Sequence, residues 1–332
     1  MRYKVDQTGD KGQFILTGSS TPVMKGVLHG GSGRIGKISM RTMSLYESGK
    51  SSGAIGLLDL FEHKLTPSVT DEVNLDMIID YIIRGGWPGI QNLPQENALV
   101  IPKDYLKNIP DDMYRMDGIK RNNRKVSALI RALGRAESTM TSLKTLQKYM
   151  MEFPEDTEEP SNTSISTIND YLDCFSRLFL IEDQPFFDVK LRSSVKALKK
   201  PKRHFTDPSL AAAAINATPK KLKNDLNTLG YLFEALCIRD LRIYSGIYDG
   251  YVYHYHDERD NEADAIIDLP DGRWGMIEIK IGYNQVDAAA DNLISLKSKF
   301  QAETGSKPEF LAVICGMANA AYQRADGVYV KF

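Results

Sequence analysis

Cysteine is scarce in this sequence: three cysteines occur among 332 residues, and no two of them form a Cys-x-x-Cys pair. This usage argues against a disulfide framework and against structural zinc, and it is typical of a reducing cytosol. The sequence also lacks an apolar run of membrane-spanning length and a signal-peptide pattern at its start. We therefore expect a soluble cytoplasmic protein without a membrane partner.

An excess of charge of one sign is missing as well. The 42 Lys and Arg residues balance 43 Asp and Glu residues, so the formal net charge is −1. Global charge therefore indicates no class of partner, and only local clusters of charge are informative. The length of 332 residues and the hydrophobic content of 42% predict a sizeable core and two or three domains. The strand and helix patterns described below indicate a multidomain α/β protein.

The stretch from Tyr251 to Ile281 has the most informative pattern in the chain. Short apolar segments of strand character are separated by turn signals at 257–261 and 270–272. Residues two apart on a strand face the same side, so Glu278 and Lys280 are predicted to project together. A hairpin bend at 270–272 would bring Asp264 next to Glu278.

Two carboxylates and an ammonium on one sheet face suit metal-assisted phosphodiester hydrolysis. Carboxylates are the hard oxygen ligands that Mg²⁺ prefers. A lysine such as Lys280 can orient or deprotonate a water and stabilise charge on the phosphate. The simpler alternative is a salt-bridged hairpin on a globular surface, because a Glu-x-Lys tripeptide is common by chance and recurs here at 62–64.

A helix predicted around Glu234 precedes these strands. The order helix-Glu, strand-Asp, strand-Glu-x-Lys resembles the PD-(D/E)xK nuclease superfamily, in particular its Holliday-junction-resolvase-like members. The resemblance implies an α/β/α restriction-endonuclease-like domain over residues 191–332. It also implies that Asp264 and Glu278 ligate Mg²⁺ or Mn²⁺, that Glu234 completes the acidic site, and that Lys280 handles the attacking water.

The sequence FILTGSS at 14–20 predicts an apolar strand that runs into a polar turn. Together with GRI at 33–35 and MRTMSLYE at 40–47, it resembles the late part of AAA-type ATPases from a prokaryotic family with an uncharacterised, nuclease-like C-terminal domain. The resemblance implies a truncated P-loop ATPase remnant over residues 1–47 and a helical lid over 48–122. The Gly-Gly-Trp-Pro sequence at 85–88 is similar to a motif in the lid of that family.

The phosphate-binding loop of such an ATPase is not in this sequence. Residues 30–33 are rich in glycine, but no Lys-Ser/Thr pair directly follows them. We therefore expect no ATP hydrolysis by this chain alone. Either the chain is shortened at its N-terminus, or the ATPase half is a separate subunit and hence a partner. In both cases the strand at 14–17 would be an open sheet edge.

Residues 123–190 predict a winged helix-turn-helix. Apolar spacing and serine caps indicate helices near 126–135, 142–151 and 164–178, and residues 179–181 and 186–189 would form the wing. Such a fold binds DNA in some proteins and serves only as a protein–protein module in others. The sequence leaves both roles open.

The stretch from Lys190 to Lys223 is strongly basic and holds a single acid, Asp207. A phosphate backbone suits such a stretch, although a solvated surface is the alternative. The residues expected to bind nucleic acid, preferentially DNA, are Lys190, Arg192, Lys196, Lys199, Lys200, Lys202 and Arg203. Asp207 stands directly before Pro208 and is predicted to cap a helix.

These patterns support two hypotheses. In the first, the chain is an ATPase-linked, nucleic-acid-binding protein with a Mg²⁺-dependent nuclease-like domain. In the second, the nuclease-like fold is a non-catalytic interaction or regulatory module that docks to an ATPase partner.

Overall fold

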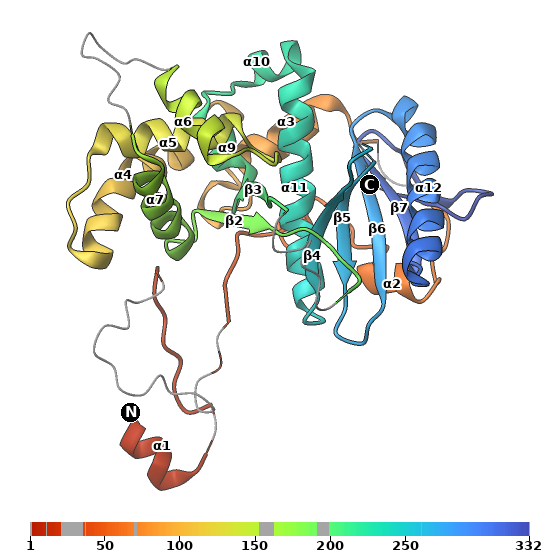
Figure 1. The fold of residues 1–332 in the computed structure, drawn as a ribbon, viewed down its shortest axis with the longest axis horizontal. Coiled ribbons are helices and arrows are strands. Elements are labelled where there is room, and N and C mark those ends of the chain that lie inside the picture. The colour runs from red at the N-terminus through yellow and green to blue at the C-terminus, as the bar shows by residue number, and fades with distance from the viewer. Residues whose placement is uncertain are drawn as a thin grey trace.

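The computed structural model describes residues 2–10, 12–20, 36, 38–69, 72–152, 163–190, 199–259 and 261–331. Helices dominate the central part of the chain, and a large mixed sheet forms toward the C-terminus (Figure 1). Within these ranges, no helix has both the length and the apolar character that a membrane crossing requires.

A seven-stranded sheet has the order β1-β8-β9-β7-β6-β5-β4. Its strands are β1 (Ser68–Val69), β4 (Tyr251–His256), β5 (Glu262–Asp268), β6 (Trp274–Lys280), β7 (Phe310–Cys315), β8 (Ala320–Gln323) and β9 (Tyr329–Lys331). The strands β4, β5 and β6 pair antiparallel, whereas β7 pairs in parallel with both β6 and β9. The hairpin predicted from the turn at 270–272 is confirmed.

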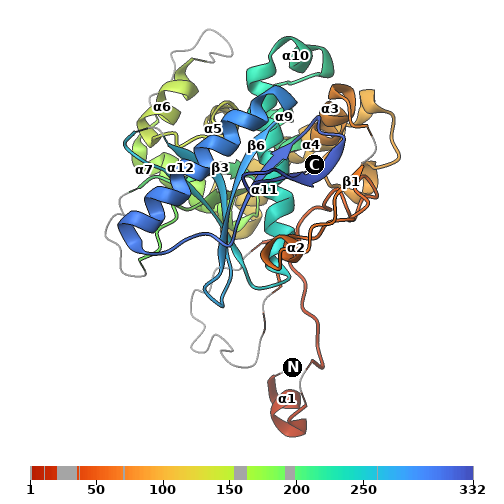
Figure 2. The same cartoon turned by 90° about the vertical axis from the view of Figure 1, so that its right-hand side faces the viewer.

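Helices cover both faces of this sheet. Helix α11 (Leu226–Gly246) lies on one face, and α12 (Val286–Thr304), which follows the short 3-10 turn η3 (Tyr283–Gln285), lies on the other (Figure 2). Neighbouring strand residues alternate between the two sides, so Ile277 packs with α11 and Met276 packs with α12. Burial on both sides explains why β6 is an almost continuous apolar run.

The central part is a group of helices. They are α3 (Leu75–Arg84), α4 (Val100–Asp117), α5 (Asn123–Arg135), α6 (Leu143–Met151), α7 (Ile165–Arg177), α9 (Pro208–Ala214) and α10 (Pro219–Asn224), with 3-10 turns η1 (Pro88–Ile90) and η2 (Gln95–Asn97). The side chains of Asn122, Ser142 and Ser164 each accept a free N–H at the start of α5, α6 and α7. The three helices predicted between 126 and 178 are confirmed.

A two-stranded ribbon, β2 (Ile181–Gln184) and β3 (Lys202–Phe205), connects the helices to the sheet. Its pairing corrects the expected wing, because residues 186–189 form no strand. Instead, Phe187 packs against Trp274 of β6 and Phe300 of α12, with ring centroids 4.9 and 6.1 Å apart. Burial of an aromatic ring against the sheet outweighs the local strand preference of this segment.

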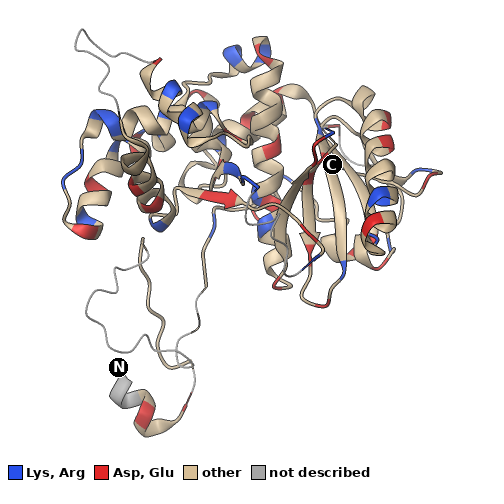
Figure 3. Ribbon diagram, viewed as in Figure 1, with Lys and Arg blue, Asp and Glu red and all other residues tan. Residues whose placement is uncertain are grey.

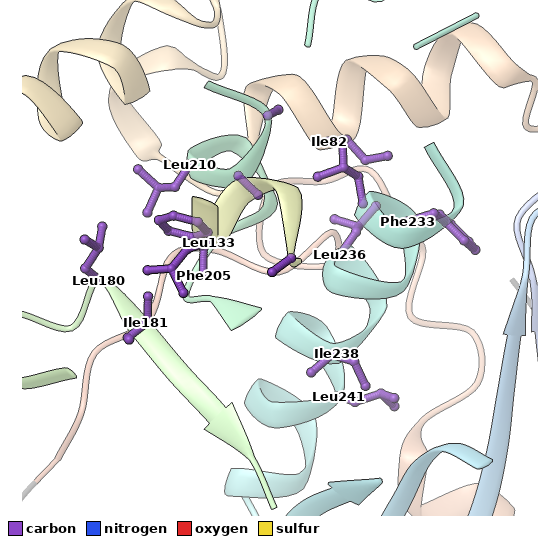
Figure 4. Close-up of a cluster of buried hydrophobic side chains, with 14 of the residues drawn as sticks. Ile82, Leu133, Leu180, Ile181, Phe205, Leu210, Phe233, Leu236, Ile238 and Leu241 are labelled. Atoms are coloured by element: carbon purple, nitrogen blue, oxygen red, sulfur yellow. The ribbon is translucent and has the colours of Figure 1, made fainter. Parts of the chain in front are cut away.

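One hydrophobic core extends through the helices and the ribbon to one face of the sheet. Figure 4 shows Leu133 of α5, Phe205 of β3 and Leu210 of α9 close together. Phe233 and Leu236 on α11 belong to the same core. Helix α11 therefore packs against both the helical group and the sheet.

The expected ATPase-type strand at 14–17 is wrong for the described structure, in which residues 12–20 form no strand. This segment and α1 (Arg2–Thr8) extend away from the other elements (Figures 1 and 2), and Ile15 is 91% exposed. A strand needs a partner for its backbone groups, and none of the described strands pairs with it. The GRI sequence at 33–35 lies outside the described residues.

Part of the expected helical lid belongs to the sheet instead. Phe61 of α2 (Leu57–Phe61) contacts Phe310 of β7 edge-on, with ring centroids 4.8 Å apart. Strand β1 pairs antiparallel with β8. Strand β1 therefore extends one edge of the C-terminal sheet, and α2 packs against it through Phe61. The expected domain boundaries after residues 47, 122 and 190 stay predictions.

Candidate active site

The four residues expected in the acidic site lie in one cluster, although they come from three elements. They are Glu234 on α11, Asp264 on β5, and Glu278 and Lys280 on β6. The register of the hairpin pairs Ala265 with Ile277, which places Asp264 opposite Glu278. The predicted neighbourhood of these two carboxylates is therefore confirmed.

Lys280 connects the two strand carboxylates. Its Nζ lies 2.7 Å from Glu278 Oε2 and 3.4 Å from Asp264 Oδ2. The backbone N–H of Ile279 donates to the same Asp264 oxygen at 2.8 Å. Asp264 is thus held by charge and by hydrogen bonds, as a buried carboxylate requires.

Lys202 is the member of the cluster that sequence reasoning misplaced. It was expected on a nucleic-acid-binding surface, but its side chain is only 3% exposed. Its Nζ lies 2.8 Å from Glu234 Oε1 and 3.6 Å from Asp264 Oδ1, and it also forms an ion pair with Glu262. Neighbouring strand residues point to opposite sides, so Lys202 and His204 are buried while Arg203 pairs with Asp183.

Asn292 on α12 was also missed. Its side-chain amide donates to Glu278 Oε1 and to the backbone oxygen of Glu262, both at 2.6 Å. No signal in the sequence marks this residue, because a polar side chain in a helix after Glu-x-Lys is unremarkable by pattern alone. Through Asn292, helix α12 fixes the orientation of Glu278.

The environment separates the carboxylates into two kinds. Burial raises the pKa of Glu234 to about 8, assisted by the charge of Asp264 and opposed by Lys202. Burial and the neighbouring Asp264 raise the pKa of Glu278 well above its ordinary value. Burial by itself would raise the pKa of Asp264. The charges of Lys202 and Lys280 and the hydrogen bond from the Ile279 amide outweigh burial, so the pKa of Asp264 is lowered.

The two lysines remain charged despite their burial. Burial lowers the pKa of each ammonium, but the surrounding carboxylates outweigh this effect and raise the pKa of both Lys202 and Lys280. The positive charges therefore balance carboxylates inside the cluster. The cluster is electrostatically satisfied by its own side chains.

A chain of polar side chains connects the site to the helical part. The Gln184 amide nitrogen donates to the backbone oxygens of Asp264 and Tyr253, both at 2.9 Å. Its oxygen lies 3.0 Å from Nε2 of His204, whose Nδ1 lies 3.0 Å from Glu137 Oε1. The ribbon thus holds the β5 backbone at Asp264 itself.

The donor chemistry of the cluster fits a divalent cation. Several carboxylates converge, and hard oxygen ligands are those that Mg²⁺ and Mn²⁺ take. The position between Glu234 and Asp264 already attracts a cation, namely the Lys202 ammonium. Over the described residues, however, no three His, Cys, Asp or Glu side chains are arranged as a metal site, because ammonium groups separate the carboxylates.

The described basic residues of the stretch from Lys190 to Lys223 lie on separate elements, near the ribbon and on α10 (Figure 3). Lys190 and Lys200 are exposed, and Lys199 lies over the Phe186 ring at 5.9 Å. Arg203 pairs with Asp183 at 3.2 Å. Arg192 and Lys196 lie outside the described residues, and the last lysines of the stretch belong to α10, away from the ribbon (Figures 1 and 2).

Asp207 caps α9 as predicted, because its side chain accepts the N–H of Ser209 at 3.0 Å. It also accepts bonds from the Gly86 N–H, the Thr42 hydroxyl and the Arg239 guanidinium. A Cβ atom on Gly86 would lie 2.1 Å from the Met43 backbone oxygen. The Gly-Gly-Trp-Pro sequence therefore has a structural role, in which the chain at Met43 approaches the end of α3 closely.

Comparisons with known proteins matched two family models. Residues 75–221 match a domain of unknown function (DUF8612), and residues 229–331 match a domain of unknown function (DUF4143). The second domain is commonly associated with AAA ATPase proteins, and no nuclease domain was found. No curated protein and no solved structure matched. The cluster therefore combines residues of both matched segments: Lys202 comes from the first, and the surrounding carboxylates and Lys280 come from the second.

Proposed function

We propose that the C-terminal part of this chain is a nuclease-like domain that hydrolyses nucleic-acid phosphodiesters with Mg²⁺ or Mn²⁺. The observation that carries the proposal is the convergence of Glu234, Asp264, Glu278 and Lys280 from three elements. A sheet covered by helices on both faces, with the carboxylates on one helix and two adjacent strands, is the arrangement expected for the PD-(D/E)xK superfamily. DNA is the preferred substrate in this proposal.

Each residue of the cluster has a distinct role in this proposal. Asp264 and Glu278 would hold the cation, with Glu234 as the third carboxylate. A bound divalent ion supplies Lewis-acid polarisation of a phosphoryl oxygen and a water of lowered pKa. Lys280, 30% exposed, is the member best placed to donate a hydrogen bond to a phosphate oxygen and to stabilise its developing charge. Asn292 positions Glu278.

The basic residues near the ribbon support contact with a phosphate backbone. Lys199 and Lys200 directly precede the strand that carries Lys202, and Lys200 is exposed. Ammonium groups at such positions bind phosphates without reading sequence. We therefore propose that this end of the ribbon guides the nucleic acid toward Lys280.

The test is cleavage of branched and linear DNA by the full chain with Mg²⁺ or Mn²⁺. Asp264→Asn and Lys280→Ala should abolish cleavage, whereas Lys307→Ala, an exposed lysine on the same domain, should retain it. Cleavage that survives Asp264→Asn would come from a contaminant or another site and would refute the assignment. Absence of cleavage by the parent chain, together with absence of Mg²⁺ or Mn²⁺ binding to the parent in the presence of DNA, would refute the function.

A second candidate is a non-catalytic module that docks to an ATPase partner. The observation in its favour is that Lys202, Asp264 and Glu278 are at most 5% exposed, which leaves a phosphate little access. The common association of the DUF4143 domain with AAA ATPase proteins is consistent with such a partner. In this case the full chain would bind an ATPase subunit equally well with Asp264→Asn, and it would show no metal-dependent stabilisation.

A further inference from the structure

The Lys202 ammonium lies between Glu234 and Asp264, where it would compete with a metal ion held by Asp264 and Glu278 for the third carboxylate, Glu234. Its Nζ lies 2.8 Å from Glu234 Oε1 and 3.6 Å from Asp264 Oδ1. A Mg²⁺ ion binds oxygen at about 2.0–2.1 Å. An ion that bridged these two oxygens would lie closer to both than Nζ does, within contact distance of the ammonium. Since like charges at that separation repel strongly, the two cations exclude each other.

Ion pairs with carboxylates hold the Lys202 side chain in the cluster. Three carboxylates surround its Nζ: those of Glu234, Asp264 and Glu262. The side chain of Lys202 is 3% exposed, so solvent hardly screens these ion pairs. A lysine buried to this degree needs such partners to remain charged.

The element that carries Lys202 lies outside the sheet that carries the carboxylates. Lys202 begins β3 of the ribbon, whereas the carboxylates lie on α11, β5 and β6. It also falls in the segment that matches the DUF8612 domain, while the carboxylates fall in the segment that matches the DUF4143 domain. One domain therefore inserts a cation into the acidic site of the other.

We propose that Lys202 is a tethered cation that closes the acidic site, so that a divalent metal binds only when the ribbon withdraws the lysine. This inference rests on the proposed metal-dependent function and describes the regulation of the same site. Withdrawal of this lysine would remove the cation shared by Glu234 and Asp264, and the seven-stranded sheet could stay intact because β3 is not one of its strands. A partner that moves the ribbon, such as nucleic acid bound at the adjacent Lys199 and Lys200, would thereby couple its own binding to metal binding.

The population of the state in which Lys202 is withdrawn determines how much the apparent metal affinity changes. If the open state is populated at about 1–10%, the apparent metal affinity is about 10- to 100-fold below the intrinsic affinity. Replacement of Lys202 by methionine, which retains much of the side-chain volume but no charge, removes the competing cation. The Mn²⁺ affinity of Lys202→Met should therefore exceed that of the parent by about 10- to 100-fold.

Mn²⁺ binding to the full chain tests this inference, by calorimetry and by the electron paramagnetic resonance signal of free Mn²⁺. The variants are Lys202→Met, Glu262→Gln and the matched control Lys307→Met, an exposed lysine remote from the cluster in the sequence. Glu262→Gln weakens the hold on Lys202 at a side chain that is 37% exposed, so it tests the same step in a protein expected to fold. Both site variants should bind Mn²⁺ more tightly than the parent, and Lys307→Met should not.

Thermal melting supplies an independent readout. Lys202→Met should melt lower than the parent in EDTA, because it leaves buried carboxylates unpaired, and Mn²⁺ should restore its melting temperature. Equal Mn²⁺ affinity in the parent and both site variants would contradict the proposed role of Lys202 as a competing cation, but it would remain consistent with a metal site. If the folded variants bind no Mn²⁺, both the proposed role of Lys202 and the proposed metal-dependent function are wrong.

Discussion

His204 and Glu137 meet across 3.0 Å in the interior, where His204 Nδ1 faces Glu137 Oε1. The other ring nitrogen, Nε2, lies 3.0 Å from the side-chain oxygen of Gln184, an acceptor, so Nε2 carries a hydrogen. Burial raises the pKa of Glu137 to about 8 and lowers the pKa of His204 well below its ordinary value. Both groups are therefore neutral near pH 7, and Glu137 donates its proton to Nδ1.

This pair predicts a pH dependence that Glu137→Gln removes. The folded-state pKa of Glu137 lies above its ordinary value of 4.5, so its contribution to stability is complete below pH 4.5 and is lost as pH rises toward 8. Glutamine can donate to Nδ1 and accept the Phe205 N–H as the protonated acid does. Relative to the parent, the variant should gain about 1 kcal/mol or more in unfolding free energy between pH 5 and pH 8.

Chemical denaturation at several pH values measures this difference. The parent-minus-variant difference isolates Glu137 from the other titrating groups. A constant difference across this pH range would contradict a protonated Glu137.

Asp264→Asn and Glu278→Gln should change stability in opposite directions without metal. Asp264 is a buried anion with two ammonium partners and a backbone donor, so its neutralisation should cost about 3 kcal/mol. Glu278 has a strongly raised pKa, because the charged form is unfavourable there, so Glu278→Gln should be neutral or stabilising at pH 7 to 8. If repulsion among the carboxylates were the only effect, both Asp264→Asn and Glu278→Gln would increase the stability of the protein. Thermal melts in EDTA distinguish these cases, and a gain with Asp264→Asn would contradict the arrangement of ion pairs.

Gly86→Ala should destabilise the protein, whereas Gly89→Ala should not. A Cβ on Gly86 would lie 2.1 Å from the Met43 backbone oxygen, while one on Gly89 meets no atom within 4 Å. The clash requires a backbone shift that costs about 1–3 kcal/mol and loosens the bond from the Met43 N–H to the Gly86 oxygen. Thermal melting and limited proteolysis before Met43 measure both effects. Equal behaviour of the two variants would show that the close approach does not constrain the chain.

Nucleic-acid binding should be sensitive to salt through Lys199 and Lys200. Each phosphate contact contributes about 0.9 to the slope of log affinity against log salt concentration for duplex DNA. Charge reversal at both lysines should lower the slope by about 1–2. Charge reversal at Lys220 and Lys307, two exposed lysines outside the ribbon, serves as the matched control. Equal slopes for both pairs would leave Lys199 and Lys200 as solvated surface.

The chain alone should neither bind nor hydrolyse ATP. Its sequence has no complete Gly-x-x-x-x-Gly-Lys-Ser/Thr pattern, on which the phosphate-binding loop depends: the partial match at 31–37 is followed by Ile38, and Gly49-Lys50-Ser51 has Ser44 in place of the first glycine. Calorimetric titration with Mg²⁺-ATP should give no heat of binding. A micromolar dissociation constant would contradict this prediction.

Local chemistry determined the hairpin and its carboxylates. The turn at 270–272 fixed the register that sets Asp264 opposite Glu278, and the period of a strand placed Lys280 beside Glu278. The sequence Asp-Pro at 207–208 likewise determined the start of α9. These features depend on neighbours within a few residues, so they can be predicted from the sequence.

Tertiary structure decided which charges are buried and which strands pair. Lysines at 200 and 202 look alike in the sequence, yet one is exposed and the other fills an acidic site, because β3 pairs with β2 and turns Lys202 toward α11. Residues 14–17 have strand character but form no strand, since their backbone groups find no described partner. Burial and strand pairing depend on segments far apart in the chain, and the free energy of those contacts exceeds the local preferences that a sequence displays.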